Sequence, residues 1–499
     1  MKLKVASLIV CLLAIFAGFW KFEALKEFIS SEKLSLNYLK ELLKLSDTCD
    51  SETLIIWTAA STKSYDTSIY NIIKNVSTQL NHSVIADSNE NGTWHLIWSY
   101  EYIFDRFPNS IRFMKLKPYQ MVNHFPGFTF LTNKLHMSVS TTQRFIPSAF
   151  NFPSLKNEFL YYAKLFPTNH FVVKNMDRGG IEIVPFEKIN FGMGSWSYMQ
   201  LFIESLLIER HAFDIGIYVL ITSVEPLRIY KWNQDVLIRF CPEEFEPFNI
   251  EAKGKYVCSI NYKNIWEFEA FEKLVESGQH TNKEILNNYL QSKGHNSSQL
   301  WTNIDFAINT VVADKAKIGL KFMKIYTNRS NNTLEHMFEL LRFDFVVDKE
   351  LNVHLMEINM SPDMNFENDK DERLKTMSLQ VVKDTLNMVG AGSYHEFKGN
   401  FSTPLSPQNI ATSIDACSEC DENCESPSCE LCVPCMSEDF KVSLYRSYKE
   451  HQRRGEFKLI FPKGNNDNIE SDVKNDLTYT TKKLMKWYEA KCDKDEDWC

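Results

Sequence analysis

The sequence predicts a mixed α/β fold, described more closely as α+β, and three patterns support that prediction. Strand-like apolar pieces recur between residues 170 and 241, among them IGIYVLITSV and LRIYKW. Residues 265–326 space their apolar side chains as helices do, and a hairpin-like pair of apolar runs follows at 340–360. The chain has 499 residues, 44% hydrophobic and 24% charged. That size allows two or three subdomains that share large cores.

The N-terminal residues 1–20 predict a signal anchor that crosses a membrane once. MKLK precedes sixteen residues, 5–20, without a formal charge. This stretch is long for a signal-peptide core and short for a full span of about 20 residues. A cleaved signal peptide is the alternative, although no clear A-x-A cleavage site is present. Lysines on both sides decide the orientation only weakly. We expect membrane localisation with the bulk of the chain in the lumen, and the cytosolic side as the alternative.

The remaining chain divides by composition into five parts. Residues 21–50, rich in Leu, Lys and Glu, predict a juxtamembrane stalk helix, and residues 51–160 a small N-terminal α/β lobe. Residues 161–392 hold the strands, helices and hairpin of two further lobes, the last helix ending at the plausible C-cap Gly390. Residues 393–440 are rich in Ser, Pro and Cys and predict a loop or insert. Residues 441–499 predict a closing helix and a charged tail.

Six of the twelve cysteines lie in one segment, CSECDENCESPSCELCVPC, which covers residues 417–435. Behind a secretory signal this spacing predicts a disulfide-stapled insert, whereas in the cytosol it would predict a zinc site. The sequence leaves both interpretations open. Short N-glycosylation motifs give weak further support for lumenal exposure. They occur at Asn75, Asn81, Asn91, Asn296, Asn328, Asn331 and Asn400.

The stretch LLRFDFVVDKELNVHLMEINMSPD places acids within a pattern otherwise typical of a buried hairpin. Burying polar groups without partners is costly, so Asp344, Glu357 and Asn359 need compensation. A turn centred on Glu350 and Leu351 puts Asp344 opposite Glu357, with Asn359 on the same face. Two carboxylates and an amide are oxygen donors that suit Mg²⁺ carrying nucleotide phosphates. We predict these three residues as metal ligands, with a solvated outer face of the hairpin as the alternative.

Several segments, in order from about Trp94 to Pro462, resemble the tubulin-tyrosine-ligase-like family. They are HLIWSYEYIF, LKPYQMVNHFPGFTFLTNK, FIPSAFNFPSLKNEF, FVVKNMDRGGIEI, MQLFIESLLIERHAFDIGIYVLITSVEPLRIYKW, VLIRFCPEEF, the hairpin and QRRGEFKLIFP. The resemblance implies an ATP-grasp-like fold and an ATP- and Mg²⁺-dependent ligase. In that chemistry ATP phosphorylates a glutamate side chain of a protein, and the amine of an amino acid attacks the acyl-phosphate. Glutamate addition to tubulin or another Glu-rich protein is the default expectation.

The resemblance also implies roles for individual residues beyond the three metal ligands. Residues placed on the nucleotide are Lys134 and Lys174 at the phosphates, Gln200 and Ile203 at the adenine hinge, and Asp214 of the F-D-I-R run. Residues placed at the reacting groups, as catalytic residues, are Arg239 and Asn261, of which Asn261 matches only the last position of the family's H-L-T-N.

Departures from the family pattern cluster at the substrate end of the implied site. Ala212 and Gly216 stand where K-F-D-I-R has a lysine and an arginine, and Leu201 stands where a lysine is usual. Losing one preorganised cation commonly costs about 10²–10³-fold in rate. Candidates to compensate are Arg178, Arg210 and His211. The alternative function is therefore a divergent pseudoenzyme that binds nucleotide or protein without efficient ligation.

The net charge of −9 gives no global basic footprint for nucleic acid. The expected partners are a Glu-rich acceptor protein such as tubulin, a free amino acid, and a membrane through the N-terminal anchor. A lumenal domain would not meet cytosolic tubulin, so the lumenal orientation implies another acceptor.

Overall fold

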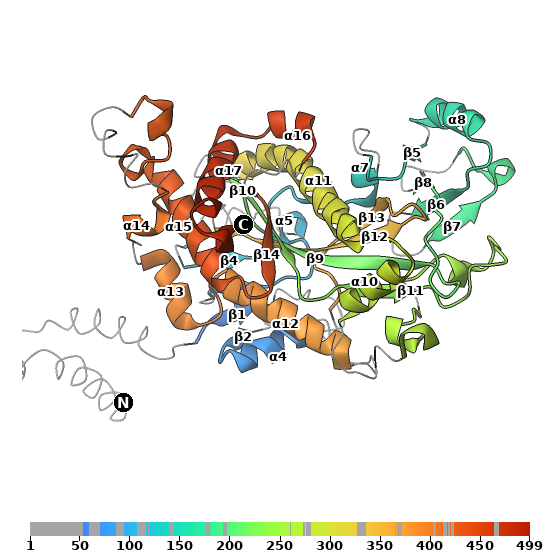
Figure 1. The fold of residues 1–499 in the computed structure, drawn as a ribbon, viewed down its shortest axis with the longest axis horizontal. Helices are drawn as coiled ribbons and strands as arrows, with labels where there is room; N and C mark the ends of the chain where they lie inside the picture. Colours follow the sequence, from blue (N-terminus) through green and yellow to red (C-terminus); the bar gives the residue numbers. More distant parts are fainter. Residues whose placement is uncertain are drawn as a thin grey trace, which may run out of the picture. The chain divides into compact units, whose positions relative to one another are not determined.

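Three β-sheets organise the part of the chain that the computed structural model describes (Figure 1). It describes residues 53–499 except 59–69, 86–93, 107–115, 118, 139–143, 153, 176–179, 193–196, 260, 273–274, 276–280, 327–335, 365, 367–371, 403–405, 413–416, 418–419, 421–423 and 464–468. The predicted signal anchor and stalk, residues 1–50, lie outside the described residues. Among the residues described, no helix has the length and apolar character needed to cross a membrane.

The first sheet is parallel and has the strand order β2-β1-β3-β4. Strands β1, β3 and β4 are short apolar runs, as expected for parallel strands covered on both faces, whereas the edge strand β2 begins with an exposed serine. Helix α4 (Asn71–Gln79) buries Ile73 and Val76 against this sheet. The strands are β1 (Ile55–Trp57), β2 (Ser83–Ile85), β3 (Leu96–Ile97) and β4 (Met121–Val122). The small α/β arrangement expected near the N-terminus is therefore present.

The second sheet is antiparallel, with the order β5-β8-β6-β7. It carries Lys174 and Gln200 on the neighbouring strands β6 and β8. Helix α8 (Lys156–Leu165) packs Phe159 against Phe150 and Phe171 of the sheet. The strands are β5 (Ala149–Asn151), β6 (Phe171–Asn175), β7 (Ile181–Val184) and β8 (Ser197–Leu201).

The third and largest sheet has the order β13-β12-β9-β10-β14, with β11 also pairing with β9. Residues 213, 215, 217, 219 and 221 of β9 share a hydrophobic cluster with α11, whereas Tyr218 and Leu220 share one with α12. This alternation puts the two helices on opposite faces of the sheet, as Figure 1 shows. The elements are β9 (Phe213–Val224), β10 (Leu227–Trp232), β11 (Leu237–Phe240), β12 (Glu339–Val347), β13 (Val353–Met360), β14 (Phe457–Phe461), α11 (Ser297–Tyr326) and α12 (Glu372–Met388).

The predicted hairpin is β12 and β13, and the predicted pairing of Asp344 with Glu357 is confirmed. The turn itself is centred on Glu350, because Val347 pairs with Val353. An irregularity in the register after Asp344 then shifts the partner strand by one residue. Without this bulge, Glu357 would point to the opposite face from Asp344.

Two predicted segments differ from the structure. The helix expected from residue 265 begins as two 3-10 turns, Ile265–Glu267 and Glu269–Phe271, because a capping box closes the first turn and Phe268 and Phe271 then enter the core. Residues 393–440, expected as a loop, include helix α13, whose Phe397 is buried. The end of α12 is as predicted, with Gly390 at φ +81°. The other helices are α5 (Ile103–Arg106), α6 (Thr129–Thr132), α7 (Lys134–Ser138), α10 (Asn282–Ser292), α13 (Tyr394–Ser402), α14 (Pro407–Ile410), α15 (Glu438–Arg453), α16 (Ser471–Asn475) and α17 (Tyr479–Cys492).

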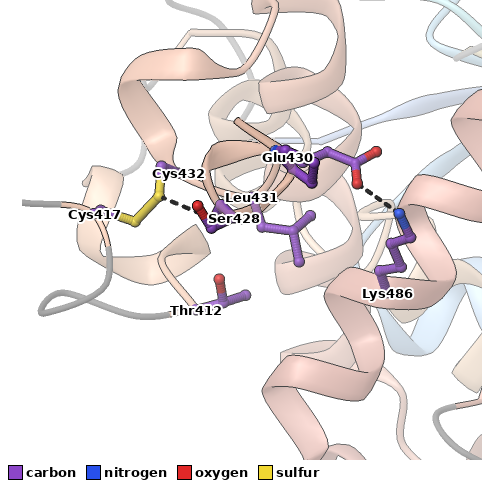
Figure 2. Close-up of a pocket in the computed structure, with 8 residues that line it drawn as sticks. Thr412, Cys417, Ser428, Glu430, Leu431, Cys432 and Lys486 are labelled. Atoms are coloured by element: carbon purple, nitrogen blue, oxygen red, sulfur yellow. Dashed lines mark hydrogen bonds and ion pairs between the residues drawn. A yellow bond between two sulfur atoms is a disulfide. The ribbon is translucent and has the colours of Figure 1, made fainter. Parts of the chain in front are cut away.

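The cysteine-rich segment forms disulfides rather than leaving thiols for zinc. The pairs are Cys417–Cys432, Cys420–Cys429 and Cys424–Cys435. Figure 2 shows the shallow pocket beside them, where Glu430 pairs with Lys486 of α17 at 2.6 Å. Two further disulfides, which the sequence analysis did not predict, are Cys241–Cys258 and Cys492–Cys499.

Candidate functional site

Two lysines and a glutamate, brought from three elements, form one side of the candidate site. Lys134 begins α7, Lys174 lies on β6, and Glu357 lies on β13. The ammonium nitrogen of Lys134 is 3.3 Å from Oε2 of Glu357. Burial lowers the pKa of Lys174 to about 8, while the charge of Glu357 opposes that shift and the charge of Lys134 adds to it. These predicted residues therefore share one electrostatic environment, although they are far apart in the sequence.

The other side is a group of five polar residues that we call the site ion cluster. Its members are Asp214, Arg239, Arg342, Asp344 and Asn359. Arg239 donates from Nε to Oδ1 of Asp214 at 2.7 Å and from Nη2 to Oδ2 of Asp344 at 3.0 Å. Arg342 donates from Nε to Oδ1 of Asp344 at 2.7 Å and from Nη2 to Oδ2 at 3.0 Å. Asn359 donates from Nδ2 to Oδ2 of Asp344 at 2.9 Å.

The cluster shifts the pKa values of its two aspartates in opposite directions. Burial alone would raise the pKa of Asp344, but the guanidinium groups of Arg342 and Arg239 outweigh it and hold that pKa below its ordinary value. For Asp214, burial raises the pKa despite the charge of Arg239, and the charge of Asp344 adds to that rise. Asp344 is therefore the firmly ionised acid of the pair.

A buried amide lies on the second sheet, at the position that the family resemblance gives to the adenine hinge. Gln200 is fully buried and donates from Nε2 to Oγ of Ser138 and to the carbonyl oxygen of Pro147, both at 3.4 Å. Its Oε1 has no hydrogen-bond partner among the described residues. A buried acceptor without a partner is uncommon in folded proteins, and this one is free to accept a hydrogen bond from a bound group. Ile203, half-buried, follows two residues after β8 ends.

The residues present fit an ATP molecule and Mg²⁺. Lys134 and Lys174 supply positive charge for phosphates, and the unpaired oxygen of Gln200 can accept from an amino group. Glu357 and Asn359 supply oxygen ligands, because an amide that donates through its nitrogen to Asp344 presents its oxygen elsewhere. Asp344 is compensated by two arginines in the structure, so its role as a ligand stays a prediction. Among the described residues, no three His, Cys, Asp or Glu side chains cluster as a metal site.

Asn261, the remaining predicted catalytic residue, lies apart from these contacts. It is exposed and has a left-handed backbone, with φ +50°. The disulfide between Cys241 and Cys258 joins its segment to the end of β11, and Lys263 bridges to Phe240. Within the described part of the chain, no hydrogen bond or ion pair joins Asn261 to the site ion cluster. The disulfide thus places Asn261 just beyond the strand that carries Arg239.

The structure also locates the departures from the family pattern. Ala212 is buried against the Cys241–Cys258 disulfide, and Leu201 packs beside the phenylalanine cluster of the second sheet, so both positions are apolar. Arg210 pairs with the exposed Glu244 at 3.0 Å, and Nδ1 of His211 is 2.7 Å from the carbonyl oxygen of Cys241. Arg178 lies outside the described residues. Arg210 and His211, which were expected to compensate for the missing cations, therefore do not contact the site ion cluster.

Sequence reasoning missed three features around this site. Arg342 carried no signal beyond a cation within an apolar strand, and Cys241 and Cys258 were not paired because 17 residues separate them. The third feature is the buried pair of His124 and Glu339, whose Nδ1 and Oε1 are 2.8 Å apart. It ties the N-H-F-P-G segment to the start of β12. A search of the sequence for charged residues within apolar strands could have found Arg342 and Glu339, but not the disulfide.

Comparisons with known proteins identify the family of this chain. The model of the tubulin-tyrosine ligase family matches residues 112–396. The chain is 31% identical over 422 residues to a probable tubulin polyglutamylase, ttll-15, of Caenorhabditis elegans, which covers 81% of this chain and 79% of that protein.

Two mouse relatives are more distant and longer than this chain. Identity is 26% to the tubulin polyglutamylase TTLL6, over 62% of this chain and 38% of that protein. It is 28% to the tubulin monoglutamylase TTLL4, over 51% of this chain and 23% of that protein. The chain therefore matches less than half the length of each mouse relative. With the family model and the nematode relative covering most of the described sheets, the chain belongs to the tubulin-tyrosine ligase family.

Proposed function

We propose that this protein is an ATP- and Mg²⁺-dependent ligase that adds an amino acid, by default glutamate, to glutamate side chains of an acceptor protein. The observation that carries the proposal is the ion pair of Lys134 with Glu357, whose charges both act on the buried Lys174. Glu357 is also paired across the hairpin with Asp344 of the site ion cluster. Such a site offers cations for phosphates and oxygen ligands for a metal within one arrangement. The names of the relatives, which are tubulin glutamylases, support glutamate and tubulin as the first substrates to test.

Each residue group would have its own task in this reaction. Lys134 and Lys174 would bind the phosphates, with the side chain of Gln200 holding the base. Glu357 and Asn359, with Asp344, would hold Mg²⁺, which when bound screens the phosphate charge during transfer to the acceptor carboxylate. Arg239, fixed by Asp214 and Asp344, would orient the phosphorylated carboxyl group for attack by the incoming amine.

The test uses the full-length protein with ATP, Mg²⁺, radiolabelled glutamate and glutamate-rich peptides, including acidic tubulin tails. We expect incorporation by the wild type and a loss of about 10²-fold or more in Glu357→Gln. The matched control is Glu350→Gln, which makes the same change at an exposed position of the hairpin turn. No incorporation by the wild type, with nucleotide binding intact, would reject the proposal.

A second candidate function is favoured by one observation, the apolar surroundings of Ala212. Ala212 packs with the Cys241–Cys258 disulfide and Phe245, so the expected lysine is replaced by an apolar contact at this position. That arrangement suits a protein that binds nucleotide without efficient ligation. Retained nucleotide affinity without incorporation, in the assay above, would establish this alternative.

We also propose that the described part of the chain lies in the lumen of the secretory pathway, anchored by residues 1–20. Five disulfides among the described residues support this proposal, since disulfides persist in oxidising compartments. A mass shift on endoglycosidase treatment of the expressed protein is expected, because a lumenal chain would carry glycans. An unglycosylated chain with free thiols would place it in the cytosol, where tubulin is available.

A further inference from the structure

The glycine at position 216 makes room for an arginine from the neighbouring strand. Gly216 lies within β9, paired with Asp344 of β12. A Cβ added to Gly216 would lie 3.1 Å from Cδ of Arg342 and 3.3 Å from Oδ1 of Asp344. Leu237 Cβ would also lie 3.3 Å away, and all three distances are tighter than most real Cβ contacts. A side chain at 216 would therefore crowd Arg342 in its present position, and one of the two would have to shift.

Arg342 uses this space to reach the candidate site. Residues 342 and 344 are two apart on β12 and therefore share a face of the sheet. The guanidinium group forms a two-pronged contact with Asp344, and Arg239 contacts the same carboxylate from β11. Arg342 is only 8% exposed, so its charge is held beside the carboxylate rather than in solvent. The side chain of Arg342 therefore lies next to Gly216, the position at which the family resemblance places an arginine.

We propose that Arg342 is a positioning residue that supplies, from β12, the guanidinium group missing at position 216 of β9. It holds Asp344 in place and adds a positive charge where the reacting carboxylate is to bind. The proposal rests on the proposed ligase function for its catalytic meaning, but the exchange between positions 216 and 342 is a property of the fold. On this proposal the site keeps its guanidinium group, which comes from position 342 of β12 instead of position 216 of β9.

The experiment is a double-mutant cycle in the full-length protein, with wild type, Arg342→Leu, Gly216→Arg and the double variant. Arg342→Leu should lower kcat for glutamate incorporation by about 10²-fold, with KM for ATP changed much less. Gly216→Arg alone should also be impaired, because its side chain meets Arg342. The double variant should recover to within about tenfold of wild type, since one arginine again occupies the space.

Two further variants separate position from charge. Arg342→Lys keeps the charge but lacks the planar fork, so it should recover only part of the activity lost in Arg342→Leu. The control Arg210→Leu removes an exposed arginine outside the site and should stay within about twofold of wild type. The unfolding midpoint and the affinity for ATP with Mg²⁺ are measured for every variant. If the double variant is no better than the product of the two single effects, the proposal is overturned.

The outcomes also separate this proposal from the proposed function. If the wild type incorporates no glutamate, the ligase function fails and the cycle is evaluated from the unfolding midpoint and nucleotide affinity. Gly216→Arg should then lower the midpoint, and Arg342→Leu in the same chain should restore it. Additive effects on both quantities would overturn the exchange between positions 216 and 342, whereas non-additive recovery would support it without any catalysis.

Discussion

Two buried ion clusters lie on the third sheet. In one, all the charged groups are buried and paired with each other, whereas the other lies beside partly exposed polar groups. In the first, which we call the closed ion cluster, Arg228 donates to both oxygens of Glu450 at 2.9 and 3.0 Å. Tyr230 and Thr222 donate to the same carboxylate at 2.9 and 3.0 Å. All four residues are buried. The closed ion cluster ties α15 to β9 and β10, and its charges cancel within the protein.

The site ion cluster has similar chemistry but a different boundary. It contains two arginines and two aspartates, and it continues through Asn359 to Glu357 and Lys134, which are only partly buried. The comparison teaches that a buried salt bridge by itself does not mark a functional site. What distinguishes the site is a charged cluster that lies beside partly exposed carboxylate, amide and ammonium groups able to bind a ligand.

The largest expected effect tests the structural role of the closed ion cluster. Arg228→Met should lower the free energy of unfolding by about 3–5 kcal/mol, because it leaves the carboxylate of Glu450 buried without its cation. Denaturant unfolding measures the loss, and Arg228→Met with Glu450→Leu should lose less than the single change. Arg239→Met in the site ion cluster should cost less stability, since Arg342 still compensates Asp344 and the other partner, Asp214, has a pKa that burial raises, so it can take up a proton. If Arg228→Met and Arg239→Met lower the free energy of unfolding equally, the two clusters do not differ in their contribution to stability.

The next effect concerns the disulfide at the edge of the site. The double change Cys241→Ser and Cys258→Ser should lower the free energy of unfolding by about 3 kcal/mol, as expected for a closed loop of this length. It should also lower ligase activity, because the segment with Asn261 is released from β11. The matched control replaces Cys492 and Cys499, which close a shorter loop near the C-terminus. If only stability falls, and activity per folded molecule does not, the disulfide is structural alone.

The smallest effect concerns the pH dependence of ATP affinity. The pKa of Lys174 is lowered to about 8 by burial, so above pH 8 the free protein holds this lysine largely neutral. Phosphate binds the charged form, so binding must take up a proton and affinity should fall as pH rises. Between pH 7 and pH 9 the loss should be about tenfold, for one linked proton. Calorimetry on the wild type and Lys174→Met tests this, and an equal slope in the variant would assign the proton elsewhere.

Much of the site could be predicted from the sequence because its parts are local patterns. Alternation along a strand put Asp344, Glu357 and Asn359 on one face, and the structure joins Asp344 to both. The bulge that makes this register possible was not predicted, since bulges depend on how two strands meet. The helical character expected over residues 265–326 is confirmed by α10 and α11, whereas its first turns are 3-10 helices in which Phe268 and Phe271 pack into the core.

The sequence by itself determined the family, the order of strands and helices along the chain, and the acids of the hairpin, because those features lie in contiguous residues. Only the tertiary structure decided that Arg342 lies close to Gly216, that Lys134 pairs with Glu357, and that the charge of Glu357 acts on Lys174. Likewise, only folding joined Cys241 to Cys258. Each of these contacts joins separate elements, and the packing of the whole sheet, rather than any local preference, sets which side chains meet.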